Sequence, residues 1–256
     1  MPDTGFHAGI PAEASTYAIP ARWREDWGVR RYGFHGLSVA WATERAAAML
    51  GRSDLRLVVC HLGGGASVTA VRDGRSVDTT MGFGPLEGLV MATRSGTVDP
   101  DVPLHLVLRH GVPAEEVERA LNEDSGLRAL AGTGDMREVE AAAAGGDDRA
   151  ALALAVYDHR LAAAVAAMTA ALGGIDALAF TGGVGEGSTR TRSEAARRLA
   201  FLGVAIGAAA AAAGDADVSA PQARVRTLVI RSREEQVIAR AVRRVLDEQQ
   251  PKGGRP

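Results

Sequence analysis

Short apolar runs, several of them followed by glycines, alternate along this chain with longer stretches of helical periodicity. The runs at 55–62 and 175–180 are mostly apolar, which is typical of strands buried on both faces of a sheet. Asp73-Gly74, a preferred pair for a hairpin turn, separates two further strand-like runs. The predicted strands cover residues 55–62, 66–72, 75–80, 175–180 and 224–230. Strands interleaved with helical patterns predict an α/β fold.

Helical patterns account for most of the remaining chain. The stretch 150–172 is the longest apolar tract, but it carries Asp158, His159 and Arg160, so we expect a buried helix and no membrane span. The predicted helices cover about 40–50, much of 85–172 with Pro85, Pro103 and Pro113 near helix starts, 189–202 and 233–248. Residues 208–213 are expected at a helix edge or in a surface loop, and the tail 251–256 is expected to be disordered.

Composition excludes several kinds of partner. The 256 residues carry a formal net charge of −2, which favours neither nucleic acid nor an anionic membrane surface. The single cysteine, Cys60, rules out an internal disulfide and is expected to be a buried, inert thiol. The sequence shows no signal peptide. These features predict a cytoplasmic protein.

The segment 78–100 has a composition that packing alone does not require. Glycines allow backbone N–H groups to approach a ligand closely, and an arginine among them offers a planar, charged fork for phosphate or carboxylate. The residues in question are Gly82, Gly84, Gly88, Gly96, Arg94, Asp78, Glu87 and Asp99. We interpret the segment as part of a site for an anionic substrate.

Two more glycine segments directly follow predicted strands, at 63–65 and 181–188. Consecutive glycines can form a nest of N–H donors for phosphate, although one such cluster alone more often indicates a tight turn. The second segment has the strand–glycine loop–helix order that places phosphates at a helix N-terminus. It is neither a Walker A loop nor a GxGxxG motif. Three glycine segments together favour a nucleotide site.

Five motifs in this chain resemble those of the acetokinase family, whose members include acetate kinase. They are residues 30–36 (RRYGFHG), 61–68 (HLGGGASV), the 78–100 segment, 181–186 (TGGVGE) and 234–239 (EEQVIA). The resemblance implies an actin-like ATPase fold of the ribonuclease-H-like type. It also implies reversible, magnesium-dependent phosphoryl transfer between ATP and acetate, giving ADP and acetyl phosphate, in a homodimer.

The resemblance also implies a domain division. Residues 3–7 resemble a segment that lies well inside the family's longer proteins, so the family's N-terminal domain is expected to be missing. Residues 1–50 would be a remnant of the central cleft and 51–250 the C-terminal domain, with a helical insertion near 100–172 and a tail at 251–256. We therefore expect this chain alone to be weakly active or inactive.

Three catalytic residues follow from the resemblance. Arg94 matches the arginine that stabilises the transferring phosphoryl group, with a surface ion pair as its alternative role. His35 matches a histidine that hydrogen-bonds the same group, and Asp3 matches the active-site aspartate. On the residues alone, His35 is more often a structural histidine and Asp3 a turn or cap residue. Phe34 and Pro85 match the pocket for the acyl methyl group.

The resemblance assigns the nucleotide and the metal as well. Glu234 matches the Mg²⁺ ligand, although a helix N-terminal charge is an alternative. Gly64 and Gly187 stand where the family has asparagines, which is expected to lower nucleotide affinity about tenfold without abolishing binding. The implied nucleotide contacts are His61, Leu62, Gly63, Gly64, Gly65, Asp135, Met136, Arg137, Gly183, Val184, Gly185, Glu186 and Gly187.

Other functions stay open at this point. The chain could be a nucleotide-binding fragment without catalysis, or a propionate or butyrate kinase. A different actin-like ATPase, such as a sugar kinase, is disfavoured by the 78–100 segment. The alanine-rich helices of 100–172 are expected to form the homodimer interface, with a place in the monomer's own core as the alternative.

Overall fold

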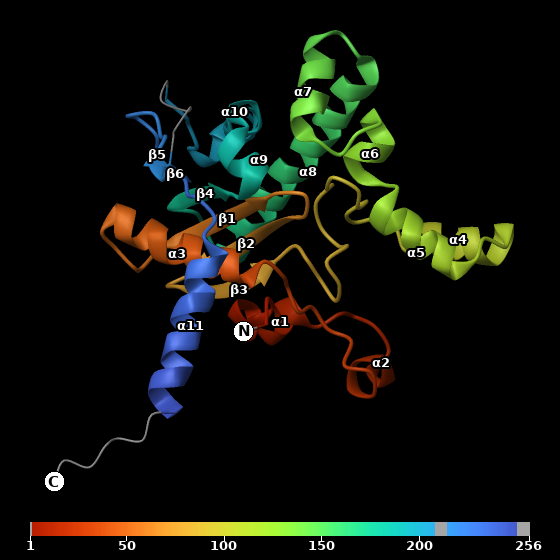
Figure 1. Ribbon diagram of the computed structural model, residues 1–256, viewed down its shortest axis with the longest axis horizontal. Helices are drawn as coiled ribbons and strands as arrows, with labels where there is room; N and C mark the ends of the chain where they lie inside the picture. Colours follow the sequence, from red (N-terminus) through yellow and green to blue (C-terminus); the bar gives the residue numbers. More distant parts are fainter. Residues whose placement is uncertain (1, 208–213, 250–256) are drawn as a thin grey trace.

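A mixed sheet lies at the centre of the computed structural model, which describes residues 2–207 and 214–249 (Figure 1). Among these residues the sheet has the strand order β3-β2-β1-β4-β6-β5. Strands β1, β2 and β3 form an antiparallel meander, and β4 and β6 lie parallel to β1 on its other side. The strands are β1 Arg56–Leu62, β2 Ala66–Arg72, β3 Arg75–Thr79, β4 Ala177–Thr181, β5 Ala216–Asp217 and β6 Arg226–Val229.

Alternate residues of β1 enter separate cores on the two faces of the sheet. Val58 and Cys60 belong to a core that includes the long helix α8 (Asp148–Leu172), whereas Leu57 and Val59 belong to a core beneath α3 (Gly36–Leu50). The two faces are covered because successive side chains on a strand point to opposite sides. Helix α11 (Glu234–Gln249) packs on α3 and then projects from the body of the molecule (Figure 1).

The remaining helices surround this centre. Helices α6 and α7 pack on α8, whereas α4 and α5 pack on each other and extend to the edge of the molecule (Figure 1). Their bounds are α4 Asp101–His110, α5 Ala114–Glu123, α6 Gly126–Ala131, α7 Met136–Ala144, α9 Gly182–Gly187 and α10 Thr189–Arg198. Short helical turns are η1 Gly5–His7, α1 Ala12–Ser15, α2 Ala21–Glu25 and η2 Ala200–Leu202.

The structure confirms the five strands predicted from the sequence and the hairpin turn at Asp73-Gly74. Both turn residues have positive φ angles, 50° and 78°, as a type I′ turn requires. Helix α3 begins four residues before the predicted start at residue 40. His35, with φ 58° in the left-handed region, occupies its N-cap position and sets that earlier start.

Three sequence predictions were wrong. Residues 80–100 form no helix, so Pro85 does not mark a helix start. The glycine loop expected at 181–188 is largely the short helix α9, and the helix expected over 189–202 breaks after Arg198 into α10 and η2. The short edge strand β5 was not predicted. The predictions for 208–213 and 251–256 concern residues outside those that the structure describes.

Helix α8 is long and apolar enough to cross a membrane by length and composition alone. One side of it, however, contributes Leu154, Leu161 and Val165 to the core against the sheet. Its fully buried Asp158 accepts hydrogen bonds from both terminal nitrogens of Arg190 on α10. A buried carboxylate with an ion-pair partner is typical of a protein core, so we interpret α8 as a core helix.

Candidate functional site

Two of the glycine segments leave the same edge of the sheet. His61 at the end of β1 is paired with Thr181 at the end of β4, and these strands are parallel. The segments 63–65 and 182–187 therefore begin side by side at the carboxyl ends of neighbouring strands, where open α/β sheets bind ligands.

A cavity of about 780 Å³ opens at this edge of the sheet. It brings together segments that are far apart in the sequence, among them Gly63 with Gly64, the start of α7, and helix α9 with Ser188. Its lining includes the predicted nucleotide residues Gly63, Gly64, Asp135, Met136, Arg137, Gly183, Val184 and Gly187. The volume falls in the usual range for small-molecule sites.

Arg94 and His35 lie beside Gly65, and His61 stacks on His35, so three side chains that can interact with an anion form one cluster. The rings of His35 and His61 stack, with their centroids 4.1 Å apart. A Cβ atom added to Gly65 would lie 3.2 Å from Nη1 of Arg94 and 3.2 Å from Nε2 of His35. A side chain at this position would displace these groups by a few tenths of an ångström, so the glycine allows the close approach of Arg94 and His35.

Both histidines are neutral near neutral pH, because the charged form is penalised by burial. Burial, and then the nearby charge of Arg94, lower the pKa of His35 to about 4. Burial, and then His35, lower the pKa of His61 to about 3. Each Nδ1 atom is within hydrogen-bond distance of a serine hydroxyl, 3.0 Å to Ser67 for His35 and 2.7 Å to Ser38 for His61. The permanent positive charge of this cluster is therefore that of Arg94.

Asp3 connects the beginning of the chain to this cluster. One of its carboxylate oxygens accepts a hydrogen bond of 2.7 Å from the backbone N–H of His35. Burial raises the pKa of Glu234, the first residue of α11, and the negative charge of Asp3 raises it further. Two carboxylates thus lie close enough to repel each other, a situation that a divalent cation relieves. The described residues contain no cluster of three or more His, Cys, Asp or Glu side chains that could hold a metal.

Some predicted residues lie near the cavity without turning a functional group into it. The Leu62 side chain is fully buried, and Gly185 is a buried residue of α9 on the side that faces Phe180. Glu186 accepts hydrogen bonds from the backbone N–H groups of Gly182 and Ser232, so its carboxylate holds α9 against the loop before α11. We infer a supporting position for all three residues.

The two residues matched to the acyl pocket lie on separate segments. Phe34 is partly buried and packs against the main core cluster. Pro85 is exposed, and its carbonyl oxygen accepts a hydrogen bond of 3.4 Å from Nη1 of Arg94. Pro85 therefore contacts the guanidinium through its backbone, and the acyl pocket stays a prediction.

Sequence reasoning missed several residues of the site. Arg128 and Glu140 line the cavity, and Ser188 both lines it and caps α10. Ser38 and Ser67 hold the two histidine rings. Ser67 offered a usable signal, since it is one of two hydroxyl residues in the mainly apolar strand β2.

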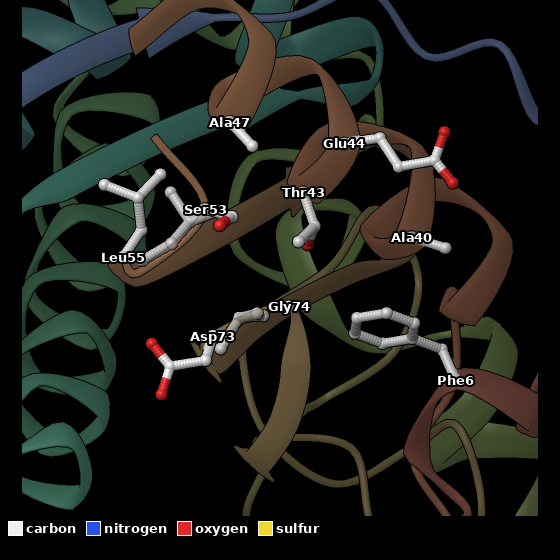
Figure 2. Close-up of a pocket in the computed structure, with 11 residues that line it drawn as sticks. Phe6, Ala40, Thr43, Glu44, Ala47, Ser53, Leu55, Asp73 and Gly74 are labelled. Carbon is white, nitrogen blue, oxygen red and sulfur yellow. The ribbon is translucent and has the colours of Figure 1, made fainter. Parts of the chain in front are cut away.

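A second, smaller cavity of about 320 Å³ lies on the α3 face of the sheet (Figure 2). Its lining is mainly apolar, including Phe6, Leu55 and Val71, with the carboxylates of Glu44 and Asp73 at its sides. No residue predicted for the functional site lines this cavity. It is thus separate from the site described above.

Comparison with known proteins agrees with this arrangement. Residues 1–240 match the model of the acetokinase family. Acetate kinase from Acaryochloris marina is 46% identical over 242 residues, which are 93% of this chain and 60% of that relative. Acetate kinase from Thermotoga maritima is 43% identical, with 96% of this chain and 63% of that relative covered. The chain thus spans about 60% of the length of these curated relatives.

Solved structures establish the fold. A crystal structure of Porphyromonas gingivalis acetate kinase superposes with a TM-score of 0.91 at 37% identity, covering 95% of this chain and 63% of the other. A propionate kinase from Francisella tularensis superposes with a TM-score of 0.88 at 39% identity, covering 93% and 62%. The actin-like α/β fold expected from the sequence is confirmed. The chain belongs to the acetokinase family.

Proposed function

We propose that the protein containing this chain transfers a phosphoryl group reversibly between ATP and acetate. A carboxylate oxygen of acetate attacks the γ-phosphorus, the bond to the bridging oxygen breaks, and ADP leaves with the electron pair. The observation that carries the proposal is the placement of Arg94, His35 and the 63–65 glycines beside a cavity lined by the three predicted nucleotide segments. Phosphoryl transfer needs mainly positioning and charge neutralisation, and this cluster offers both.

Each residue has a role in this proposal. The 63–65 and 183–187 segments contact the phosphates and ribose of ATP or ADP, and Asp135 to Arg137 flank the adenosine. Arg94 neutralises charge on the transferring phosphoryl group. In this role the neutral His35 ring would carry its proton on Nε2 and donate it to the same group, with Nδ1 accepting from the Ser67 hydroxyl 3.0 Å away.

Asp3 and Glu234 would hold Mg²⁺. They supply the hard oxygen ligands that this ion prefers, and Mg²⁺ is commonly held by one or two carboxylates together with substrate phosphates. When bound, the ion neutralises phosphate charge. The mutual repulsion of the two carboxylates supports this assignment.

Two alternatives remain within the family. The first is a chain that binds nucleotide without catalysis, since this chain spans about 60% of the length of the acetate kinases that it matches. The second is a related acyl kinase. The chain is about as similar to the propionate kinase as to the acetate kinase of known structure, and this supports the alternative. A cytoplasmic location fits all of these activities.

We expect Mg·ADP to bind to this chain, and Gly64→Asn and Gly187→Asn to tighten that binding by up to about tenfold each. Both glycines line the cavity, and a Cβ atom at either position would meet no other atom within 4 Å. An asparagine there adds one hydrogen bond, worth about 0.5–1.5 kcal/mol. Isothermal titration calorimetry with Mg·ADP measures the dissociation constants.

Gly9→Asn is the matched control for these variants. A Cβ atom at the exposed Gly9 also meets no other atom within 4 Å, but Gly9 is not among the residues lining the cavity. Its affinity should equal that of the unmodified chain. Absence of Mg·ADP binding at millimolar nucleotide would contradict the nucleotide site itself.

A homodimer is the proposed assembly, with α4 at its interface. This helix buries none of its residues within the chain and exposes Val102, Leu104, Leu106 and Leu108. Exposed apolar clusters of this kind mark contact surfaces. Light scattering coupled to size exclusion should give about twice the 26.6 kDa chain mass at micromolar concentration, and Leu104→Glu together with Leu108→Glu should give the monomer. A monomeric unmodified chain would contradict the proposal.

A further inference from the structure

A network of three polar side chains holds the irregular segment that follows β3. The network consists of Tyr17, Arg31 and Glu87, none of which lines the proposed nucleotide cavity. Arg31 donates to one oxygen of the Glu87 carboxylate at 2.8 Å, and the Tyr17 hydroxyl donates to the other oxygen. The Arg31 guanidinium carbon also lies 5.5 Å from the centroid of the Tyr17 ring. Each member of the network therefore contacts the other two.

The network differs from an exposed ion pair, because it also binds the backbone. The Arg31 side chain is only 16% exposed, and its Nη1 atom lies 3.0–3.2 Å from the carbonyl oxygens of residues 79–81. Burial, and then the hydrogen bond to Glu87, raise the pKa of Tyr17 to about 12, so its hydroxyl keeps its proton and donates. Charge-assisted hydrogen bonds in a partly buried setting are stronger than those of a solvated pair. The network thus anchors the chain where β3 ends.

Gly82 lies at the centre of the network. Its carbonyl oxygen accepts hydrogen bonds from the backbone N–H groups of residues 32–33, and the Tyr17 hydroxyl oxygen accepts one from the N–H of Phe83. A Cβ atom on Gly82 would lie 1.8 Å from Oε2 of Glu87 and 2.1 Å from the Tyr17 hydroxyl oxygen. Even alanine at this position would therefore displace the Glu87 carboxylate, so the network needs a glycine here.

The network joins the two segments that carry His35 and Arg94. Arg31 shortly precedes His35 on one segment, and Glu87 shortly precedes Arg94 on the other. Close to Glu87, the Pro85 carbonyl oxygen accepts the 3.4 Å hydrogen bond from Nη1 of Arg94. Residues 80–100 contain no helix or strand, so no regular hydrogen bonding within the segment fixes Arg94. Its position depends on contacts with other segments, and the network supplies several of them.

We propose that Tyr17, Arg31 and Glu87 are positioning residues that hold the guanidinium of Arg94 beside His35. The proposal rests on the phosphoryl transfer proposed above, in which Arg94 and His35 meet the transferring group. The three residues act through the backbone of residues 79–87 and not on the substrate. Misplacing a catalytic group by about 1 Å can reduce a rate about 10²-fold, so a network of this kind has a large effect on turnover.

The first test uses this chain and needs no catalysis. Glu87→Ala should speed amide hydrogen exchange in peptides covering residues 80–97 at least about tenfold, because the segment loses its anchor. Gly82→Ala should act in the same direction. Tyr17→Phe removes a single hydroxyl, so it should have a smaller effect, and it replaces Glu87→Ala if that variant does not fold. Mass spectrometry measures the exchange, and an unchanged rate in the folded variants would overturn the proposal.

The second test asks whether the network acts through Arg94. It uses a chimera that joins this chain to the part of Acaryochloris marina acetate kinase that the chain does not match. Glu87→Ala should lower kcat about 10- to 100-fold and change the KM for ATP less than about twofold. In a chimera that already carries Arg94→Ala, the same substitution should cost less than about threefold, because residues that act as a unit are not additive. An equal loss in both backgrounds would overturn the proposal.

Asp176→Asn is the matched control. The Asp176 carboxylate also pairs with an arginine, Arg56, and accepts hydrogen bonds from its side chain and backbone. This pair lies at the opposite edge of the sheet, where β1 and β4 begin. Its loss should leave both kcat and the exchange of residues 80–97 unchanged. An inactive unmodified chimera would contradict the proposed function, and the exchange experiment on this chain would then decide whether the network anchors the segment.

Discussion

Replacing Arg94 with alanine is expected to reduce acetyl phosphate formation by a factor of about 10²–10³ while changing ADP affinity less than twofold. The guanidinium lies beside His35 and Gly65 and, under the proposed function, meets charge that develops during transfer, so its loss raises the transition-state energy. The measurement is a hydroxamate assay. It is made on a chimera that joins this chain to the part of Acaryochloris marina acetate kinase that the chain does not match.

Two further variants test whether the rate depends on the guanidinium group of Arg94 or on positive charge in general. Arg94→Lys keeps the charge but loses the planar fork, so we expect it to recover only a small part of the rate. Arg160→Ala removes an exposed arginine of α8 and should leave the rate unchanged. Normal turnover by the Arg94→Ala chimera, with the unmodified chimera active, would show that Arg94 is structural. An inactive unmodified chimera would contradict the proposed function itself.

Acidification from pH 7.5 to pH 5 is expected to lower the free energy of unfolding by about 3–4 kcal/mol through His35 and His61 alone. Their folded pKa values, about 4 and about 3, lie below the ordinary value of 6.5. The unfolded chain therefore binds more protons over this window, and stability is lost as the pH falls. Burial lowers the pKa of His7 as well, so it acts in the same direction.

Urea unfolding at half-unit pH steps measures this dependence. The variant His61→Gln should flatten the slope between pH 6.5 and 5, because glutamine does not titrate. His159→Gln should leave the slope unchanged, since His159 is exposed. A stability that does not vary over this pH range would show that the two rings are not held neutral in the folded protein.

Local pattern was sufficient to predict the strands of the sheet but not the conformation of the glycine-rich segments. Strands β1 and β4 are apolar on both faces, which makes them recognisable without any knowledge of their partners. Glycine disfavours helices, so the sequence of α9 predicted a loop. The helix forms because the Glu186 carboxylate accepts the N–H of Gly182, and because Ser232, from a distant loop, donates to the same oxygen.

The segment 80–100 illustrates the same limit. Its backbone is held by α6, where the N–H groups of Leu127 and Arg128 donate to the carbonyls of Met91 and Ala92. Such pairings depend on residues more than thirty positions away, which periodicity within the segment does not reveal. The family resemblance, and no local signal, likewise predicted that one site would bring together Arg94, His35 and the 63–65 glycines.

The parallel pairing of β1 with β4 has a consequence for how the chain acquires its structure. The strands of the meander β1–β2–β3 are neighbours in the sequence. The other edge of β1 pairs with β4, and in that pairing Leu57 lies opposite Ala177, about 120 residues later. Synthesis at about 5–20 residues per second leaves that edge open for about 6–24 s. The Cys60 side chain points from a face of β1 into the core shared with α8, which is synthesised about 90–110 residues later, so the thiol that is inaccessible in the finished protein is uncovered until α8 packs. Chemical damage to the single cysteine of this chain is therefore a hazard of synthesis and not of the mature fold.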